Sequence, residues 1–290
     1  MGMGFSYLRR DRVLLGSDGQ DPGDFIRGRP QQPRAPRNAV SFGQSIFVNY
    51  GISDRLAVLV NQPYFERQTS QFTRNLATGA ITTTGADAAG LGDLDLRFRY
   101  NLWRSTIQDK WVTLIATTTL PTGKFNKVAI DSPALQTGTG APSFGGGLLF
   151  SYSWRDLWIH TSTTYTARLE NRDRYKFGNE AAAGLAFHYT PNYNHMFGVE
   201  LDVAHVEKNE NLGAKVGNSG GVRANVNFVA DWRFMNALGG NFTLRAAVGM
   251  SMYEDLNRQT IGQRDQVQLG GGYFANLALN YATRFPFIEE

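Results

Sequence analysis

Asn241–Met252, with the sequence NFTLRAAVGMSM, decides the fold because its polar and apolar side chains alternate at every second residue. A period of two predicts a β-strand with one apolar face. A strand in a soluble protein averages about 5–6 residues, whereas a strand that crosses a bilayer needs about 9–11. The length therefore favours a membrane strand. The apolar face carries Phe242, Leu244, Ala246, Val248, Met250 and Met252, and the other face includes Asn241, Thr243, Arg245, Gly249 and Ser251.

Similar segments recur along the whole chain. We place twelve of them, at residues 4–14, 39–52, 55–66, 90–103, 110–123, 142–154, 156–169, 175–190, 195–208, 219–233, 241–254 and 265–283. Five short connections alternate with six mostly longer ones, as in outer-membrane barrels with short periplasmic turns and longer external loops. The sequence therefore predicts an all-β fold, a transmembrane up-and-down antiparallel β-barrel of about 12 strands. We expect residues 1–290 to form a single domain, with a weakly patterned first strand and an Arg/Pro-rich first loop in residues 1–38.

The composition excludes several other classes of protein. The 290 residues are 42% hydrophobic, 19% charged and 12% aromatic, with no cysteine. No apolar run approaches the roughly 18 residues of a membrane-spanning helix, which excludes a helical membrane protein. The many aromatic and β-branched residues exclude a disordered chain. The missing cysteine excludes a disulfide-stapled scaffold, a cysteine-based zinc site and a thiol enzyme.

Aromatic residues gather at the ends of the predicted strands. All five tryptophans lie beside the short turns. Amphipathic rings collect at the boundary between membrane and water, so these residues predict an aromatic girdle on the periplasmic side. The predicted membrane-interface set is Trp103, Trp111, Trp154, Trp158, Trp232 and Tyr281.

Charged side chains lie on the faces opposite the apolar ones and are expected to line the lumen. The predicted pore-lining residues are Asp93, Asp95, Arg97, Arg99, Glu180, Glu200, Asp202, Arg223, Asp231 and Arg245. Two consequences remain open: opposed acids and bases could create a transverse field that orients solutes, or they could pair across strands and brace the barrel. Six carboxylates against four guanidiniums predict a mild cation preference, weakened by salt screening beyond about 8 Å.

Signals for catalysis, metals and cofactors are weak. The four histidines, His160, His188, His195 and His205, show no metal-ligand spacing, and we expect structural or interfacial roles for them. The glycine-rich segment 138–147 lacks the Lys-Ser/Thr ending of a phosphate-binding loop, and no Gly-x-Ser-x-Gly elbow of a hydrolase occurs. We predict no enzyme activity, no cofactor and no metal.

The N-terminal stretch is basic, with arginines at positions 9, 10, 12, 27, 29, 34 and 37. Such a stretch can neutralise phosphates of nucleic acid or of lipid headgroups, or be a solvated loop. For a barrel in a membrane we expect contacts with outer-membrane lipids and lipopolysaccharide, and none with nucleic acid. Residues Met1–Gly4 lack a secretory signal pattern, so we expect a mature chain whose export signal has been removed.

Three short motifs resemble those of a known family. Gly90–Tyr100 (GLGDLDLRFRY) is similar to a "GxGD plus alternating strand" signature, and Tyr50–Leu56 (YGISDRL) to a "YG-turn-DRxE" hairpin, although position 57 is Ala rather than an acid. Leu120–Lys124 (LPTGK), with the glycine-rich 138–147, is similar to a "PTG … GTG" external loop. These motifs resemble the outer-membrane transporter family named after the meta-pathway of phenol degradation. The resemblance spans residues 40–283 and implies an outer-membrane channel for hydrophobic or aromatic solutes.

Three functions compete at this point. The leading one is a passive channel for small solutes in the outer membrane of a Gram-negative bacterium. The second is a non-conducting structural or docking barrel, such as the porin sleeve of an electron conduit, with a protein partner in the lumen or periplasm. Its haem protein would be a separate chain, because no C-x-x-C-H occurs here. The third is a hydrolase with its active site at the rim.

Overall fold

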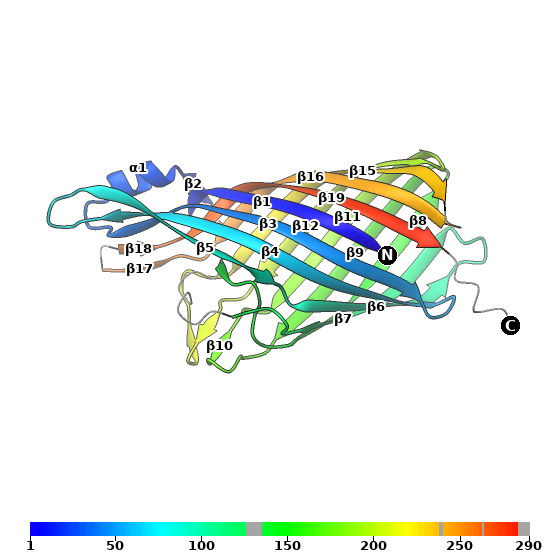
Figure 1. The fold of residues 1–290 in the computed structure, drawn as a ribbon, viewed down its shortest axis with the longest axis horizontal. Helices are drawn as coiled ribbons and strands as arrows, with labels where there is room; N and C mark the ends of the chain where they lie inside the picture. Colours follow the sequence, from blue (N-terminus) through cyan, green and yellow to red (C-terminus); the bar gives the residue numbers. More distant parts are fainter. Residues whose placement is uncertain (126–134, 238–239, 263, 284–290) are drawn as a thin grey trace.

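A computed structural model describes residues 1–125, 135–237, 240–262 and 264–283. Figure 1 shows one barrel of tilted strands, in which each barrel strand pairs antiparallel with its neighbours. Twelve strands form the closed ring, and two further strands, β2 and β5, extend the same 14-stranded sheet. The barrel strands are β1 Gly2–Leu15, β3 Arg34–Gly51, β4 Leu56–Arg74, β6 Leu94–Arg104, β7 Lys110–Leu120, β8 Ser143–Trp154, β9 Leu157–Arg168, β11 Glu180–Asn192, β12 His195–Val206, β15 Gly221–Ala237, β16 Gly240–Leu256 and β19 Gln268–Thr283. The predicted fold class and number of barrel strands are confirmed.

The first and last strands close the ring. β1 pairs with β19 from Gly2↔Asn280 to Leu14↔Gln268, and its other edge pairs with β3. The weakly patterned first strand is therefore a full barrel strand of 14 residues. Each of the twelve described ring strands is thus paired on both sides. A strand in lipid requires this, because no water is there to bind free backbone groups.

The outer face of the barrel is apolar. On β8, alternate residues point outward and are exposed, among them Phe144 (54%) and Leu148 (48%), whereas Gly145, Gly147 and Ser151 point inward. Exposed apolar side chains continue around the ring, including Ile46, Phe98, Leu114, Phe228, Val248 and Leu277. So large an apolar surface is stable only against another apolar phase, and here that phase is the acyl region of a bilayer. No described helix is long and apolar enough to cross a membrane.

The two ends of the barrel differ. The end that carries Gly51 and Trp154, here the short-turn end, has tight connections such as Arg155–Asp156 between β8 and β9. At the opposite, long-loop end, β4 extends beyond the ring and pairs with β5 (Ile81–Leu91) in a long hairpin. Part of the predicted loop 68–89 is thus strand. Several predicted boundaries also move: the segment expected at 175–190 becomes a barrel strand only from Glu180.

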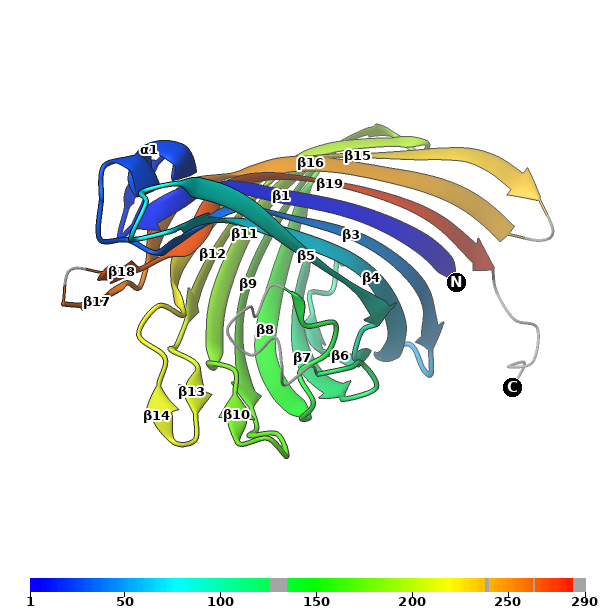
Figure 2. The same ribbon diagram turned by 60° about the vertical axis from the view of Figure 1, so that its left-hand side comes forward.

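Small elements decorate the long-loop end. Figure 2 shows helix α1 (Pro22–Arg27) on one side of this end and the short strands β10 (Tyr175–Lys176), β13 (Glu210–Asn211) and β14 (Ala214–Lys215) on the other. Strand β2 (Asp18–Gln20) precedes the helix, and β17 (Gln259–Ile261) pairs with β18 (Arg264–Gln266). The first loop, predicted from its Arg and Pro content, therefore contains a helix capped by Asp21. A small buried core lies here, formed by Val13, Phe25, Ile26, Ala35 and Val267.

Candidate functional site on the lumen wall

Alternation and register place most of the predicted pore-lining residues on the inner face. On β6, Asp95, Arg97 and Arg99 alternate with Phe98 and Tyr100, which are about 40% exposed on the outer face. The remaining inward-facing residues are Glu180 on β11, Glu200 and Asp202 on β12, Arg223 and Asp231 on β15 and Arg245 on β16. Strand parity therefore assigns these nine residues to the lumen side.

An ion-pair network joins four strands in the short-turn half of the lumen. Arg245 donates to Glu200 Oε1 at 2.7 Å and to Asp231 Oδ2 at 3.5 Å. His188 Nε2 lies 3.0 Å from the same Glu200 oxygen. The side chains are 13–38% exposed, so water reaches them and the pairing costs less desolvation than in a dry core. The sequence left open whether the charged side chains create a transverse electric field or pair across strands. In this part of the lumen they pair.

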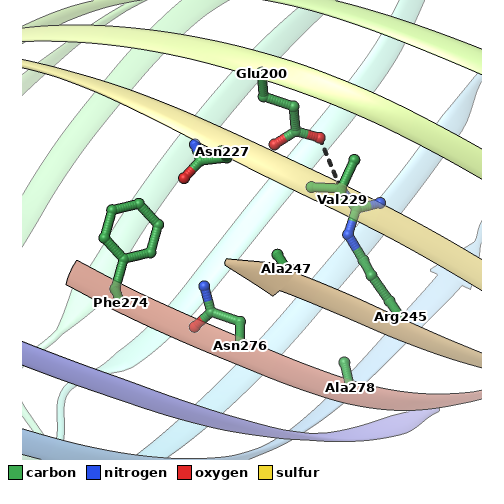
Figure 3. Close-up of a pocket in the computed structure, with 8 residues that line it drawn as sticks. All are labelled: Glu200, Asn227, Val229, Arg245, Ala247, Phe274, Asn276 and Ala278. Atoms are coloured by element: carbon green, nitrogen blue, oxygen red, sulfur yellow. Dashed lines mark hydrogen bonds and ion pairs between the residues drawn. The ribbon is translucent and has the colours of Figure 1, made fainter. Parts of the chain in front are cut away.

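A cavity of about 190 Å³ lies beside this network. Figure 3 shows Glu200 and Arg245 at its edge and the ring of Phe274 facing them from β19. Its lining is completed by Asn227, Val229, Ala247, Asn276 and Ala278. Apolar and amide groups thus surround one charged pair, a lining that can contact both an apolar body and a polar group of a solute.

Aromatic rings continue the inner wall on the adjoining strands. Trp111 on β7 stacks on Trp158 on β9, with ring centroids 5.2 Å apart and planes 19° apart. Trp158 stacks in turn on His160, which lies 5.2 Å from the ring of His188. His160 Nδ1 also lies 2.8 Å from the Oγ of Ser151. We call Trp111, Trp158, His160 and His188 the aromatic stack. Its last member, His188, contacts Glu200.

The aromatic stack corrects part of the predicted membrane girdle. Trp111 is in register with Ser151, and Trp158 with Ser153, two residues of the inner face of β8. Both rings therefore face the lumen, because strand parity, and not closeness to a turn, decides on which side a side chain lies.

The other predicted girdle residues lie on the outer face. Trp103, Trp154 and Trp232 are 50–58% exposed there. Tyr281 is on the outer face of β19 and packs on Phe242, with ring centroids 4.9 Å apart. Their position agrees with the interface role that the sequence predicts.

Asp93 is not part of the strand wall. It lies in the connection between β5 and β6, and its Oδ1 accepts a hydrogen bond from the backbone N–H of Gly123 at 2.9 Å. Its Oδ2 accepts from the N–H and the hydroxyl of Thr139, each at 2.7 Å. The carboxylate anchors the two described ends of the β7–β8 loop, and the pore-lining role of Asp93 stays a prediction. Residues 126–134 of this loop lie outside the described residues.

The same loop reaches inward. Leu135, Gln136 and Thr137 are buried, and the carbonyl oxygen of Gln136 accepts a hydrogen bond from Arg67, which projects from the inner face of β4. The segment therefore narrows the long-loop mouth from within. Sequence patterns gave no indication of this, because an irregular loop has no periodicity.

Four further charged residues of the lumen were missed by the sequence analysis. Arg10 on β1, Arg67 on β4, Arg168 on β9 and Glu254 on β16 all face inward. Arg10 lies in the weakly patterned strand and Arg67 just beyond the predicted strand 55–66. A bulge near Tyr253 changes the parity before Glu254.

The charge inventory changes as a result. Without the rim residues Arg12, Arg104 and Arg233, the inward arginines are Arg10, Arg67, Arg97, Arg99, Arg168, Arg223 and Arg245, against the carboxylates of Asp95, Glu180, Glu200, Asp202, Asp231 and Glu254. Seven bases thus face six acids among the described residues. The acid excess behind the predicted cation preference is wrong.

One side of the lumen is lined by small residues. Gly145, Gly147 and Ser151 on β8 are followed by Gly184 and Ala186 on β11. Short side chains fill less of the bore than long ones. Among the described residues, no group of three or more His, Asp or Glu is placed to hold a metal ion.

Comparisons with known proteins agree with this geometry. The fold matches an outer membrane channel from Pseudomonas putida F1 with a TM-score of 0.64 and 13% identity, over 96% of this chain and 93% of that chain. It matches the NanC porin with a TM-score of 0.50 and 11% identity, over 97% of this chain and 100% of that chain. A comparison with curated protein sequences finds no match.

The closed ring with an apolar exterior places the chain in the bacterial outer membrane, where barrels of this kind occur. The family model described as "Putative MetA-pathway of phenol degradation" matches residues 41–249, more than half of the 290-residue chain. This match agrees with the resemblance of the three turn motifs. The chain belongs to that family.

Proposed function

We propose that this barrel is a passive channel of the outer membrane that conducts small solutes. The wall of small residues on β8 and β11 carries the proposal, because it leaves room for a path along the lumen beside the ion-pair network. Twelve strands surround a space wider than that of an eight-strand barrel filled by its own side chains, and narrower than that of a sixteen-strand porin.

The finer part of the proposal is that the channel accepts solutes with a ring or another apolar body. The aromatic stack supports it: flat faces of Trp111 and Trp158 line the lumen near the short-turn end. Offset stacking on such faces is worth roughly 0.5–1.5 kcal/mol beyond burial. Contacts of this size hold a ring long enough to guide it and release it again.

A planar-bilayer recording of the refolded protein tests the proposal. We expect reproducible single-channel steps. Ala186→Trp, on the inner face beside His160, should reduce the conductance, because the indole enters the free space. Leu185→Trp is the matched control on the outer face of the same strand, where tryptophan meets lipid, and should leave the conductance unchanged.

The outcome separates the channel from the non-conducting barrel. A protein that is folded by circular dichroism but electrically silent would contradict the channel and favour the structural sleeve, since the network of Glu200, Arg245 and Asp231 also braces the wall. Equal effects of the two tryptophan variants would place the conducting path elsewhere.

A further inference from the structure

Three arginines from separate strands gather in the long-loop half of the lumen. Arg10 on β1 is in register with Ala39 of β3, and Arg67 on β4 is in register with Ser41, one pleat further along the same inner face. Strands lie about 4.8 Å apart, so the two backbones are separated by roughly 10 Å. The long side chains of two arginines span such a gap, and Arg10 interacts electrostatically with Arg67.

The third arginine reaches the same place from the opposite edge of β1. Arg223 Nε lies 3.1 Å from Glu254 Oε1. The other oxygen of Glu254 accepts a hydrogen bond from the backbone N–H of Gly271, next to Gly272, which is in register with Arg10. Arg10 interacts electrostatically with both Arg223 and Glu254. We call Arg10, Arg67 and Arg223 the arginine cluster.

The arginine cluster has more positive charge than its surroundings neutralise. Glu254 is 5% exposed and is already bound by Arg223 and by a backbone N–H. Asp93, the other carboxylate near Arg67, accepts three hydrogen bonds from the β7–β8 loop. Among the described residues, Arg10 and Arg67 have no carboxylate at ion-pair distance. Partly buried guanidiniums without a counter-charge are costly, and a bound anion removes that cost.

The cluster also lies where a solute has to pass. Arg67 donates to the carbonyl oxygen of Gln136, in the inward segment of the β7–β8 loop that narrows the mouth. Closer to the short-turn end, Arg97 and Arg99 project from the inner face of β6. Neither forms an ion pair with a described residue. Toward the short-turn end the lumen thus offers two more arginines that have no carboxylate partner among the described residues.

We propose that the arginine cluster binds the oxyanion group of the transported solute, a carboxylate or a phosphate, and that the channel therefore prefers small anions. The planar fork of a guanidinium matches both groups with paired hydrogen bonds. The anion would then pass from the arginine cluster to Arg97 and Arg99. This inference rests on the proposed channel function and adds the chemical class of its solute.

Reversal potentials in a KCl gradient test the preference. The refolded wild type should be more permeable to chloride than to potassium. Arg10→Gln should lower that ratio by about fourfold, because one unit charge at roughly 10 Å in water changes the level of each ion about twofold, in opposite directions for chloride and potassium. The side chain of Arg10 forms no hydrogen bond or ion pair with a described residue, so Arg10→Gln removes a charge without breaking such a contact. Arg10→Lys should keep the ratio. Arg9→Gln is the matched control, because it removes the same charge from the neighbouring residue on the outer face, where Arg9 pairs with Asp11.

Two probe anions test binding and identify the group. Succinate and inorganic phosphate are each added to the long-loop side during chloride conduction. At least one should reduce the wild-type current with a concentration dependence that weakens in Arg10→Gln and survives in Arg9→Gln. Block by succinate alone assigns a carboxylate, and block by phosphate alone assigns a phosphate.

Several results would overturn the inference. A conducting wild type with cation preference, or equal ratios for Arg10→Gln and Arg9→Gln, would contradict the anion site and leave the channel function standing. Conduction that neither probe reduces would do the same. Electrical silence of folded protein would contradict both. Circular dichroism and the heat-dependent gel mobility of each variant show that it has folded.

Discussion

Trp111 and Trp158 stack inside the barrel, with ring centroids 5.2 Å apart, although the strands that carry them are separated by β8. The contact forms because the residues between them on the inner face of β8 are small: Trp111 is in register with Ser151 and Trp158 with Ser153. Two large rings thus meet across a strand of small side chains. This arrangement connects the lumen wall of β7 with His160, His188 and the ion pairs of β12 and β16.

The stack predicts which tryptophans are reached by water. In variants that keep a single tryptophan, the fluorescence of Trp158 should be quenched by a water-soluble quencher such as acrylamide and hardly by brominated lipid. Trp154, 58% exposed on the outer face, is the matched control with the opposite behaviour. Quenching of Trp158 by lipid would contradict its place in the lumen.

The two faces of β19 predict a difference in stability. Leu277 lies on the outer face midway between Tyr273 and Tyr281, so it is near the centre of the membrane. Leu277→Arg should lower the free energy of unfolding by about 2–4 kcal/mol, the cost of an arginine in the middle of the bilayer. Urea titration of the refolded barrel in liposomes measures it.

The neighbouring Asn276 supplies the control, because it faces the cavity beside Glu200. Asn276→Arg should cost much less, since its guanidinium stays in water. Equal costs for Leu277→Arg and Asn276→Arg would be inconsistent with one lipid face and one wet face.

Asp93 predicts how firmly the β7–β8 loop is held. Asp93→Ala removes the acceptor of three hydrogen bonds from Gly123 and Thr139. One hydrogen bond to a charged group contributes roughly 1.5–3 kcal/mol, so trypsin should cut after Lys124 about tenfold faster or more. Mass spectrometry of the fragments over time measures the rate.

Asp95→Ala is the control for this prediction. Asp95 accepts a hydrogen bond from the hydroxyl of Thr119, a strand residue, so its loss should leave the cleavage after Lys124 unchanged. If both variants are cut at the wild-type rate, Asp93 does not hold the loop.

The unequal ends of the barrel predict its orientation. In bacterial barrels the longer loops face outward and the short turns face the periplasm. Trypsin added to intact cells should therefore cut after Lys124 in the β7–β8 loop, and not after Lys110 at the short-turn end. Cleavage after Lys110 in intact cells, with Lys124 protected, would invert the orientation.

The sequence by itself determined the barrel. Alternation on Asn241–Met252 and its repeats fixes which side chains share a face, because the period of a strand is two and does not depend on its neighbours. The longer and shorter connections then give an up-and-down order. For these reasons the number of barrel strands and the inner faces carrying Arg97, Glu200 and Arg245 could be predicted without coordinates.

Only the tertiary structure decided which residues the side chains on these faces contact. Trp111 and Trp158 stand beside turns like Trp154, and the register with β8 shows that their rings face inward and meet each other. The bulge between Asn101 and Trp103 likewise changes which residues face outward near the end of β6. Asp93 and Gln136 lie in irregular segments, where no period relates sequence to direction.

The arginine cluster shows most clearly that a sequence pattern does not reveal which distant residues come together. Arg10, Arg67 and Arg223 are far apart in the sequence and come together because β1 closes the ring between β19 and β3. A local pattern sets the face of each residue, whereas its charged neighbours depend on pairings between distant strands and on bulges. The sequence thus specified the wall, and ring closure specified which charges on the wall interact.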